Sequence, residues 1–366
     1  MKKLWLPICC LALSLSLVAC KQKGKKLVTP SKKTVNQPPA KRTKAVTIAK
    51  GTLAAFGALP TVFENKKNAL TQARIDLGRM LYYDKRLSKN HDVSCNSCHK
   101  LDKYGVDNEP TSPGHKKQRG DRNSPTVYNA AGHFVQFWDG RSPDVEDQAT
   151  GPVTNPVEMA LKDGKAAVTV LKSIPGYVTA FKKAFPKAKT PLTFKNMGRA
   201  IAAFERKLVT PSRWDKFLKG DKKALTDREK LGFKKFLSTG CMACHTGTLL
   251  GGHMYQKVGL VKPWPGIKDT GRMKVTKKAG DKFFFKVPSL RNIDKTAPYM
   301  HNGAVKTLEN AVVLMARHQL GRELKKEDVS LIVAFLKTLT GKLPTDYIKQ
   351  PKLPASGPKT PKPDPT

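Results

Sequence analysis

Apolar residues recur at helical spacing in four separate parts of the chain. Their positions are Leu70, Ala73, Leu77 and Leu81; Met197, Ile201, Phe204 and Leu208; Leu308, Val312 and Met315; and Val329, Ile332, Val333, Leu336 and Leu339. Each set falls on one face of a helix, so the pattern predicts four amphipathic helices, the first ending near Tyr83. A fifth is predicted from the capping box Thr226-Asp227-Arg228-Glu229 to Gly240. The chain is therefore expected to be mainly α-helical.

Two stretches have the pattern C-x-x-C-H, namely Cys95-Asn96-Ser97-Cys98-His99 and Cys241-Met242-Ala243-Cys244-His245. In a c-type haem site the two thiols of this pattern form thioether bonds with the porphyrin, and the histidine ligates the iron. A zinc site is the alternative. Zinc ribbons, however, place their cysteine pairs much closer together and leave the adjoining histidine unexplained. The two stretches predict two covalently bound haem c groups.

The three remaining cysteines of the seven in the chain, Cys9, Cys10 and Cys20, lie near its start. A positive start, Met1-Lys2-Lys3, and an apolar run too short to span a bilayer comfortably predict a signal peptide over residues 1–19. Leu17-Val18-Ala19-Cys20 resembles the bacterial lipoprotein box, which makes Cys20 the candidate lipidation site. An ordinary signal cleaved nearby, which would leave Cys20 free, is the alternative.

Export agrees with the haem motifs, because c-type haem is attached outside the cytoplasmic membrane. We therefore expect a periplasmic lipoprotein anchored to a bacterial membrane. Residues 20–50 are expected to be a flexible tether, since the stretch from Lys21 to Lys50 has ten Lys or Arg residues and no acid. The Pro-rich residues 348–366 are expected to form an extended tail. The length between these ends fits two haem domains, residues 51–209 and 210–347.

The formal net charge is +40, and +26 of it belongs to residues 51–342. The electrostatic field of so much positive charge can attract nucleic acid, anionic lipid or an acidic protein. Nucleic acid is not expected, because the chain is predicted to be exported and carries no known nucleic-acid motif. The basic surface is expected to steer an acidic electron donor or to lie against anionic lipid.

Several single residues are candidates for a catalytic or ligand role. Each of these residue types is also common in a purely structural role. His115 lies in a polar loop and Glu158 in a Pro-broken segment, where both types are usually solvated. Trp138, in an aromatic stretch, suits packing against a haem. Met315 suits the core side of a helix. A cytochrome c haem, however, needs a sixth ligand from further along the chain, and Met315 is a candidate for it in competition with Met254, Met273 and Met300.

Taken together, the motifs resemble the bacterial di-haem cytochrome c peroxidases over nearly the whole span from Ala54 to Tyr347. The resemblance rests on both haem motifs, on Asn123-Ser124-Pro125-Thr126, Phe137-Trp138-Asp139-Gly140-Arg141, Asn155-Pro156-Val157-Glu158-Met159, Val287-Pro288-Ser289-Leu290-Arg291-Asn292 and Thr296-Ala297-Pro298-Tyr299, and on the helix bearing Met315. It implies two cytochrome c-like domains, an N-terminal peroxidatic one and a C-terminal electron-transfer one, with haem and calcium sites near their interface.

The resemblance also implies roles for particular residues. The second haem would be held by His245 and Met315, and the first by His99 with His115 as its distal ligand in the resting enzyme. Glu158 and Gln148 match the distal acid–base pair, and Trp138 matches a tryptophan between the haems. Asn123 with the backbone oxygens of Thr296 and Pro298 matches a calcium site. A related branch, which modifies tryptophans of a partner protein, has tyrosine where Met315 stands, so methionine favours the peroxidase.

The function implied is reduction of hydrogen peroxide to water with electrons from a small cytochrome c or cupredoxin. Reduction of the C-terminal haem would release His115 and activate the enzyme. A homodimer is expected. The alternatives are a di-haem electron carrier, which gives no role to Glu158 and Gln148, and the protein-modifying oxidase.

Overall fold

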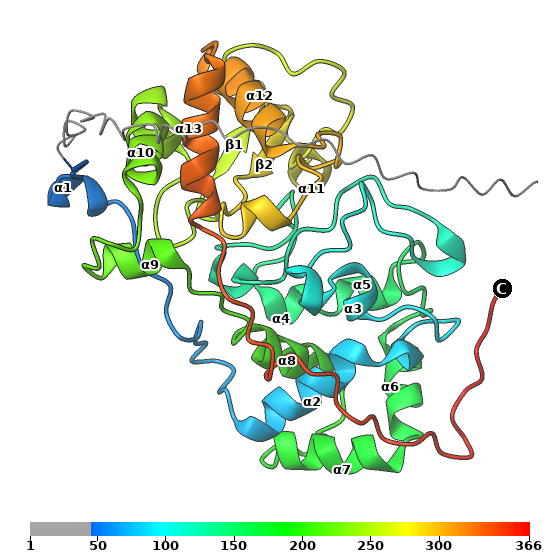
Figure 1. Ribbon diagram of the computed structural model, residues 1–366. Helices are drawn as coiled ribbons and strands as arrows, with labels where there is room; N and C mark the ends of the chain where they lie inside the picture. The colour runs from blue at the N-terminus through cyan, green and yellow to red at the C-terminus, as the bar shows by residue number, and fades with distance from the viewer. Residues whose placement is uncertain (1–44) are drawn as a thin grey trace, which may run out of the picture. The chain divides into compact units, whose positions relative to one another are not determined.

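The computed structural model describes residues 45–366 (Figure 1). The predicted signal peptide, the lipidation site Cys20 and most of the basic tether lie outside the described residues. No helix within residues 45–366 is both long and apolar enough to cross a membrane. The described chain is mainly helical, as the hydrophobic pattern predicts.

Helix α2 (Gln72–Tyr83) packs against α8 (Phe194–Glu205), and these two helices form the centre of what we call the N-terminal bundle. Thr71 caps α2 by accepting a hydrogen bond from the backbone of Arg74. Gly78 lets the helices approach closely, because a Cβ there would overlap the carbonyl oxygen of Ala200. Both helices are the predicted ones, although α8 ends three residues before Leu208.

The same arrangement recurs in the C-terminal bundle, where α10 (Asp227–Thr239) packs against α13 (Lys326–Lys337). The predicted capping box of Thr226 and Glu229 is confirmed. Here Gly232 is the point of close approach, to the carbonyl oxygen of Leu331. Gly240 ends α10 with φ +101°, which directs the chain into the second haem motif. Helix α12 (Leu308–Leu320), whose N-terminus Thr307 caps, packs against α13.

The remaining elements are short. The other α-helices are α1 (Lys50–Leu53), α3 (Cys95–Cys98), α4 (Val145–Gln148), α5 (Gly151–Thr154), α6 (Gly164–Lys172), α7 (Pro175–Ala184), α9 (Arg213–Leu218) and α11 (Met273–Thr276). The 3₁₀ turns are η1 (Lys85–Leu87), η2 (Leu101–Lys103), η3 (His115–Lys117), η4 (Ala130–Gly132), η5 (Cys241–Ala243), η6 (Ala279–Asp281) and η7 (Ile293–Lys295). Strand β1 (Tyr255–Lys257) pairs antiparallel with β2 (Phe284–Lys286), with Tyr255 opposite Lys286.

The buried apolar residues form two main cores, one in each bundle, and each core also receives a residue from a distant part of the chain. Phe56, which precedes α2, packs edge-on against Trp214 and Phe233 of the C-terminal bundle. Ile348, which follows α13, lies in the core of the N-terminal bundle. Figure 1 shows both crossings, with the blue start near α9 and α10 and the red end passing α8 and α2. The domain boundary predicted at residues 209 and 210 stays a prediction.

Candidate functional site: two haem motifs and the contacts between them

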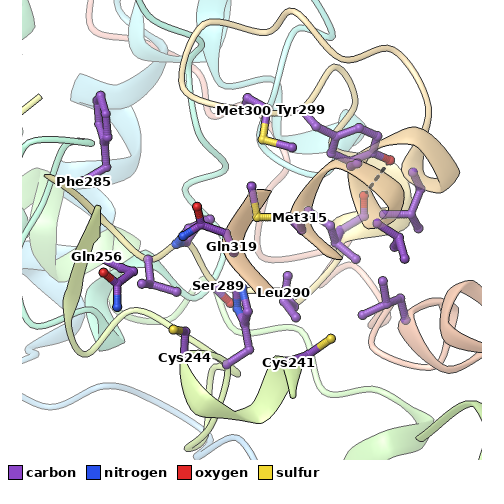
Figure 2. Close-up of a pocket in the computed structure, with 18 of the residues that line it drawn as sticks. Cys241, Cys244, Gln256, Phe285, Ser289, Leu290, Tyr299, Met300, Met315 and Gln319 are labelled. Atoms are coloured by element: carbon purple, nitrogen blue, oxygen red, sulfur yellow. Dashed lines mark hydrogen bonds between the residues drawn. The ribbon is translucent and has the colours of Figure 1, made fainter. Parts of the chain in front are cut away.

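The second C-x-x-C-H motif opens onto a largely apolar cavity between α10, α12 and the segment 285–301. Cys241, Cys244, His245 and Met315 all line this cavity, and Figure 2 shows Met315 pointing into it from α12. The Nδ1 atom of His245 lies 3.0 Å from the carbonyl oxygen of Leu250. Burial lowers the pKa of His245 to about 4, so the ring is neutral and its other nitrogen is free to ligate a metal.

The cavity also narrows the choice of a sixth ligand for this haem. Met300 lines it together with Met315, whereas Met254 and Met273 do not. Met315 is carried by the long, capped helix α12, and Met300 by a loop in which its own φ is +73°. A helical position holds a ligand more rigidly, so Met315 remains the candidate and Met300 its competitor.

The first motif forms the short helix α3, which Ser94 and Ser97 close with a capping box. His99 ends this helix, and its carbonyl oxygen accepts a hydrogen bond of 2.7 Å from the hydroxyl of Tyr82 on α2. Burial lowers the pKa of His99. Its Nδ1 atom has no hydrogen-bond partner within residues 45–366. A buried neutral imidazole with unused hydrogen-bonding capacity fits a metal ligand.

Both motifs fit covalent haem in their cysteine chemistry as well. The four thiols are free, and in the part of the chain that the structure describes no cysteine is in a disulfide. Burial raises the pKa of Cys98 to about 11 and that of Cys241 to about 12, so these thiols are not reactive surface cysteines. The residues that would hold the two groups are therefore Cys95, Cys98 and His99, and Cys241, Cys244 and His245.

The structure brings together two of the residues proposed for the distal side of the first haem. The backbone N–H of His115 donates a hydrogen bond of 2.7 Å to the carbonyl oxygen of Glu158. Gly114 makes this approach possible, since a Cβ there would overlap the backbone of Val157 and Glu158. Lys116 and Lys117, which follow His115, have φ values of +54° and +60°. Two successive non-glycine residues in the left-handed region make this a strained turn.

Glu158 is a partly buried carboxyl group with two partners that favour its charged form. Burial raises its pKa, while Arg141 and a hydrogen bond of 2.9 Å from the amide of Asn155 lower it in part. Arg141 lies over the ring of Phe137, with its guanidinium carbon 3.4 Å from the ring centre. Gln148 is the last residue of α4, which contacts α5 just before the Glu158 segment.

The C-terminal tail is a contact that the sequence did not reveal. Its extended residues run over the N-terminal bundle, where Arg86 bonds Ser356, Ser173 bonds Thr360, and Lys89 pairs with Asp364 at 3.5 Å. The carbonyl oxygen of Thr366 lies 3.4 Å from the Nε2 atom of His115. In this structure His115, which is 5 % exposed, thus contacts the tail through the nitrogen that an iron ligand would use.

Trp138 lies where the two bundles meet. Its indole N–H donates a hydrogen bond of 2.9 Å to the carbonyl oxygen of Asn123, and its own carbonyl oxygen accepts one of 2.8 Å from Lys286 of the C-terminal bundle. Trp138 also lines the cavity of the second haem motif. The residue is therefore in contact with both bundles.

The proposed calcium ligands Asn123, Thr296 and Pro298 line that same cavity. The side-chain amide of Asn123 donates to the carbonyl oxygen of Glu109 at 3.0 Å, which leaves its oxygen for another partner. Within residues 45–366 no three His, Cys, Asp or Glu side chains gather as a metal site. An ion here would depend on amide and carbonyl oxygens, which calcium accepts.

Two buried charge clusters were not found from the sequence. The side chain of Arg291 is fully buried and pairs with Asp215 at 2.8 Å. Arg122 pairs with both Asp139 and Asp269 at 2.6 Å, and its positive charge lowers the pKa of Asp269. Arg291 and Asp139 fall inside the motifs that carry the resemblance, but their partners lie far away in sequence, so no local pattern could pair them.

The fold and the two motifs define a class, that of mainly helical c-type cytochromes with two haem groups on one chain. The chain belongs to the di-haem cytochrome c peroxidase family, and it is an oxidoreductase that acts on hydrogen peroxide and carries two haem c groups. The profile of the family described as "Di-haem cytochrome c peroxidase" matches residues 72–223. Family membership decides against the pure electron carrier.

Individual relatives support this assignment. The cytochrome c551 peroxidase of Pseudomonas aeruginosa is 48% identical over 82% of this chain and 88% of its own length. That of Nitrosomonas europaea is 49% identical over 79% of this chain and 86% of its own length. A crystal structure of a MauG-like protein associated with microbial copper homeostasis aligns with a TM-score of 0.69 at 26% identity, covering 80% of this chain and 97% of that one.

Proposed function

We propose that the chain reduces hydrogen peroxide to water at the N-terminal haem, with electrons that a small redox protein delivers to the C-terminal haem. The observation that carries this assignment of roles is the contact between the strained His115 turn and Glu158. This contact places His115, the proposed releasable iron ligand, beside Glu158, the proposed proton-transfer group. At the C-terminal site the proposed counterpart of His115 is Met315, which lines the cavity of the second motif.

The proton chemistry is assigned to Glu158. Its carboxylate accepts a proton from one oxygen of hydrogen peroxide and returns a proton to the other, so that water leaves. Asn155 holds the carboxylate through the 2.9 Å hydrogen bond, and Arg141 partly offsets the rise in its pKa that burial causes. Gln148 orients the peroxide or the carboxylate. When bound, the haem groups would pass two electrons from the donor to each peroxide, which with two protons gives two molecules of water.

The two sites are made unequal by their sixth ligands. A thioether from Met315 favours ferrous iron and raises the reduction potential, so the C-terminal site accepts an electron first. His115 would be the residue that holds the N-terminal iron in the resting enzyme, and its departure after reduction of the C-terminal haem would make room for peroxide. Trp138, which contacts both bundles, lies on the electron path.

The electron donor is proposed to dock on the basic segment that covers the C-terminal cavity. Residues 255–282 contain seven Lys and one Arg against two Asp. Within them Leu260 is 52% and Val261 is 56% exposed, so the segment offers exposed apolar side chains as well as positive charge. Trp264, three residues further on, lines the cavity and contacts His318. An acidic cytochrome c or cupredoxin with an apolar contact patch fits this surface.

Three further features belong to the proposal. Calcium held by Asn123, Thr296 and Pro298 would touch both bundles and couple them. Lipidation at Cys20 and the basic tether would anchor a periplasmic enzyme to a bacterial membrane. The assembly would be a homodimer.

The test uses the full-length di-haem protein, reduced by one electron and then titrated with hydrogen peroxide under anaerobic conditions. One haem spectrum is expected to change stoichiometrically and fast in the half-reduced protein, and to stay nearly unchanged in the fully oxidised protein. The His115→Gly variant is expected to react without prior reduction. Equal reactivity of the oxidised and half-reduced wild-type forms would rule out reductive activation.

A further inference from the structure

Lys286 is a buried lysine without an acidic partner. It is 5 % exposed at the end of β2, and its Nζ atom contacts the Nδ1 atom of His133 at 2.9 Å. No Asp or Glu of residues 45–366 acts on it, and burial alone lowers its pKa to about 7. A buried ammonium group is costly unless an anion compensates it, so this residue lacks the partner that its environment demands.

The position of Lys286 is fixed from both bundles. Its backbone N–H donates to the carbonyl oxygen of Trp138 at 2.8 Å, and its side chain reaches His133 in the N-terminal bundle. His133 is itself packed against Gly252, where a Cβ would overlap the imidazole ring. Burial and the neighbouring Lys286 lower the pKa of His133, so the ring is neutral and accepts the hydrogen bond. The ammonium group is therefore held in place before any ligand arrives.

Both residues line the cavity that contains the second haem motif, together with Cys241, Cys244 and His245. The Nε2 atom of His133 is also buried and has no partner among the described residues. The site thus offers a fixed cation and a second unused donor beside a cavity with largely apolar walls. A haem fits this chemistry, because its porphyrin is apolar and its two propionate groups are carboxylates.

We propose that Lys286, positioned by His133, binds a propionate group of the C-terminal haem. The ion pair supplies the anion that the buried lysine lacks and fixes the haem in one orientation in its cavity. A positive charge retained beside the haem also favours the reduced iron, which carries one positive charge less. Lys286 therefore raises the reduction potential of the C-terminal site. This role concerns haem binding and potential, and it holds whichever electron donor or activation step the enzyme uses.

The experiment measures the midpoint potentials of both haems in the full-length di-haem protein by spectroelectrochemistry. Lys286→Met is expected to make reduction of the C-terminal haem about tenfold less favourable, which is a fall of about 59 mV for a one-electron couple. The N-terminal haem should keep its potential. Lys286→Arg, which retains the charge, should stay close to wild type. An unchanged potential in Lys286→Met would overturn the proposal.

Lys282 provides the matched control, because it is an exposed lysine only four residues away. Lys282→Met is expected to leave both potentials unchanged, since water and salt screen an exposed charge. If it shifts the C-terminal haem as much as Lys286→Met does, the effect is one of overall charge and the proposal fails. If Lys286→Met does not accumulate with both haems, Lys286→Gln removes only the charge, and an unchanged potential in that variant is equally decisive against the ion pair.

Discussion

Glu158 is partly buried and has Asn155 and Arg141 as neighbours. Burial raises the pKa of its carboxyl group, whereas both neighbours lower it. Burial is the larger effect, so the pKa of the carboxyl group is raised. A base needs a pKa near the working pH, because a weaker base takes protons poorly and a stronger one is already protonated. The environment of Glu158 moves an ordinary glutamate towards that condition.

The first prediction concerns the carboxylate itself. Glu158→Gln keeps the shape of the side chain and removes the proton acceptor, so peroxide turnover is expected to fall by about 10²–10⁴-fold. Visible spectra of both haems should be those of the wild type, which shows that the sites are intact. Glu64→Gln changes an exposed glutamate and serves as the control. Turnover within a few fold of wild type in Glu158→Gln would assign the proton transfer to another group.

The second prediction concerns pH. Because Glu158 must be ionised and its pKa is raised, kcat/KM should fall on acidification at a higher pH than for an ordinary glutamate. Arg141 lowers this pKa, so Arg141→Gln should move the acid limb of the profile to still higher pH. The measurement is the pH profile of kcat/KM for both proteins. An acid limb at the same pH in both would show that another group titrates.

At the scale of elements, each bundle is built on one helix pair that crosses at a glycine. Gly78 of α2 faces the backbone of α8, and Gly232 of α10 faces the backbone of α13. In both bundles the glycine-bearing helix is the last long one before a haem motif. The crossing therefore sets the position of the cysteines relative to the rest of the bundle.

A methyl group at this crossing should destabilise the bundle. Gly232→Ala places Cβ on the carbonyl oxygen of Leu331 and must push α10 and α13 apart, at a cost of about 1–3 kcal/mol. Denaturant unfolding of the haem-loaded protein measures the change. Gly280→Ala is the control, because nothing lies within 4 Å of its Cβ position, and it should be neutral within about 0.5 kcal/mol. Equal stability of the two variants would contradict the close crossing.

The elements also show what could be predicted from the sequence. Helix α10, which has a capping box at its start and a glycine at its end, was predicted with nearly correct ends, because these signals are local. Strands β1 and β2 were missed, since three residues are too few to show an alternating pattern. The haem-binding cysteines can be identified from the C-x-x-C-H spacing in the sequence. The pairs Lys286–His133 and Arg291–Asp215 cannot, because their members meet only in the folded chain.

At the scale of the whole molecule, the described chain is held together by segments that cross between bundles. Phe56 is buried among aromatic rings of the C-terminal bundle, and Ile348 among apolar residues of the N-terminal one. The tail that follows Ile348 adds polar contacts to α6 and to the His115 turn. Its Pro- and Lys-rich composition indicated an extended segment but gave no sign of a partner.

Removing the tail is expected to loosen the N-terminal bundle selectively. Deletion of residues 352–366 removes the contacts of Arg86, Ser173, Lys89 and His115, and should lower the free energy of unfolding by about 1–3 kcal/mol, since each net hydrogen bond contributes about 0.5–1.5 kcal/mol. The potential of the C-terminal haem should not change. A Lys359→Gln/Lys362→Gln double variant keeps the backbone contacts and should unfold like wild type. Unaltered unfolding of the truncated protein would show that the tail does not stabilise this bundle.

The large positive charge leads to the last prediction. If it steers an acidic donor, the second-order rate of electron transfer should fall steeply as salt is raised, because the Debye length shrinks from about 30 Å at 0.01 M to about 10 Å at 0.1 M. Stopped-flow mixing with an acidic cytochrome c measures this rate. A basic cytochrome c should react slowly at low salt and faster as salt is added. A rate independent of salt for both donors would remove electrostatic steering.

The tail contacts also bear on the order in which the protein matures. Residues 348–366 follow both bundles along the chain, so they are synthesised after everything they cover. Until then, the surface beside Lys89 and His115 lies open, and the first haem motif has already emerged. The cysteines Cys95 and Cys98 can therefore react with haem before residues 348–366 pack onto this side of the N-terminal bundle.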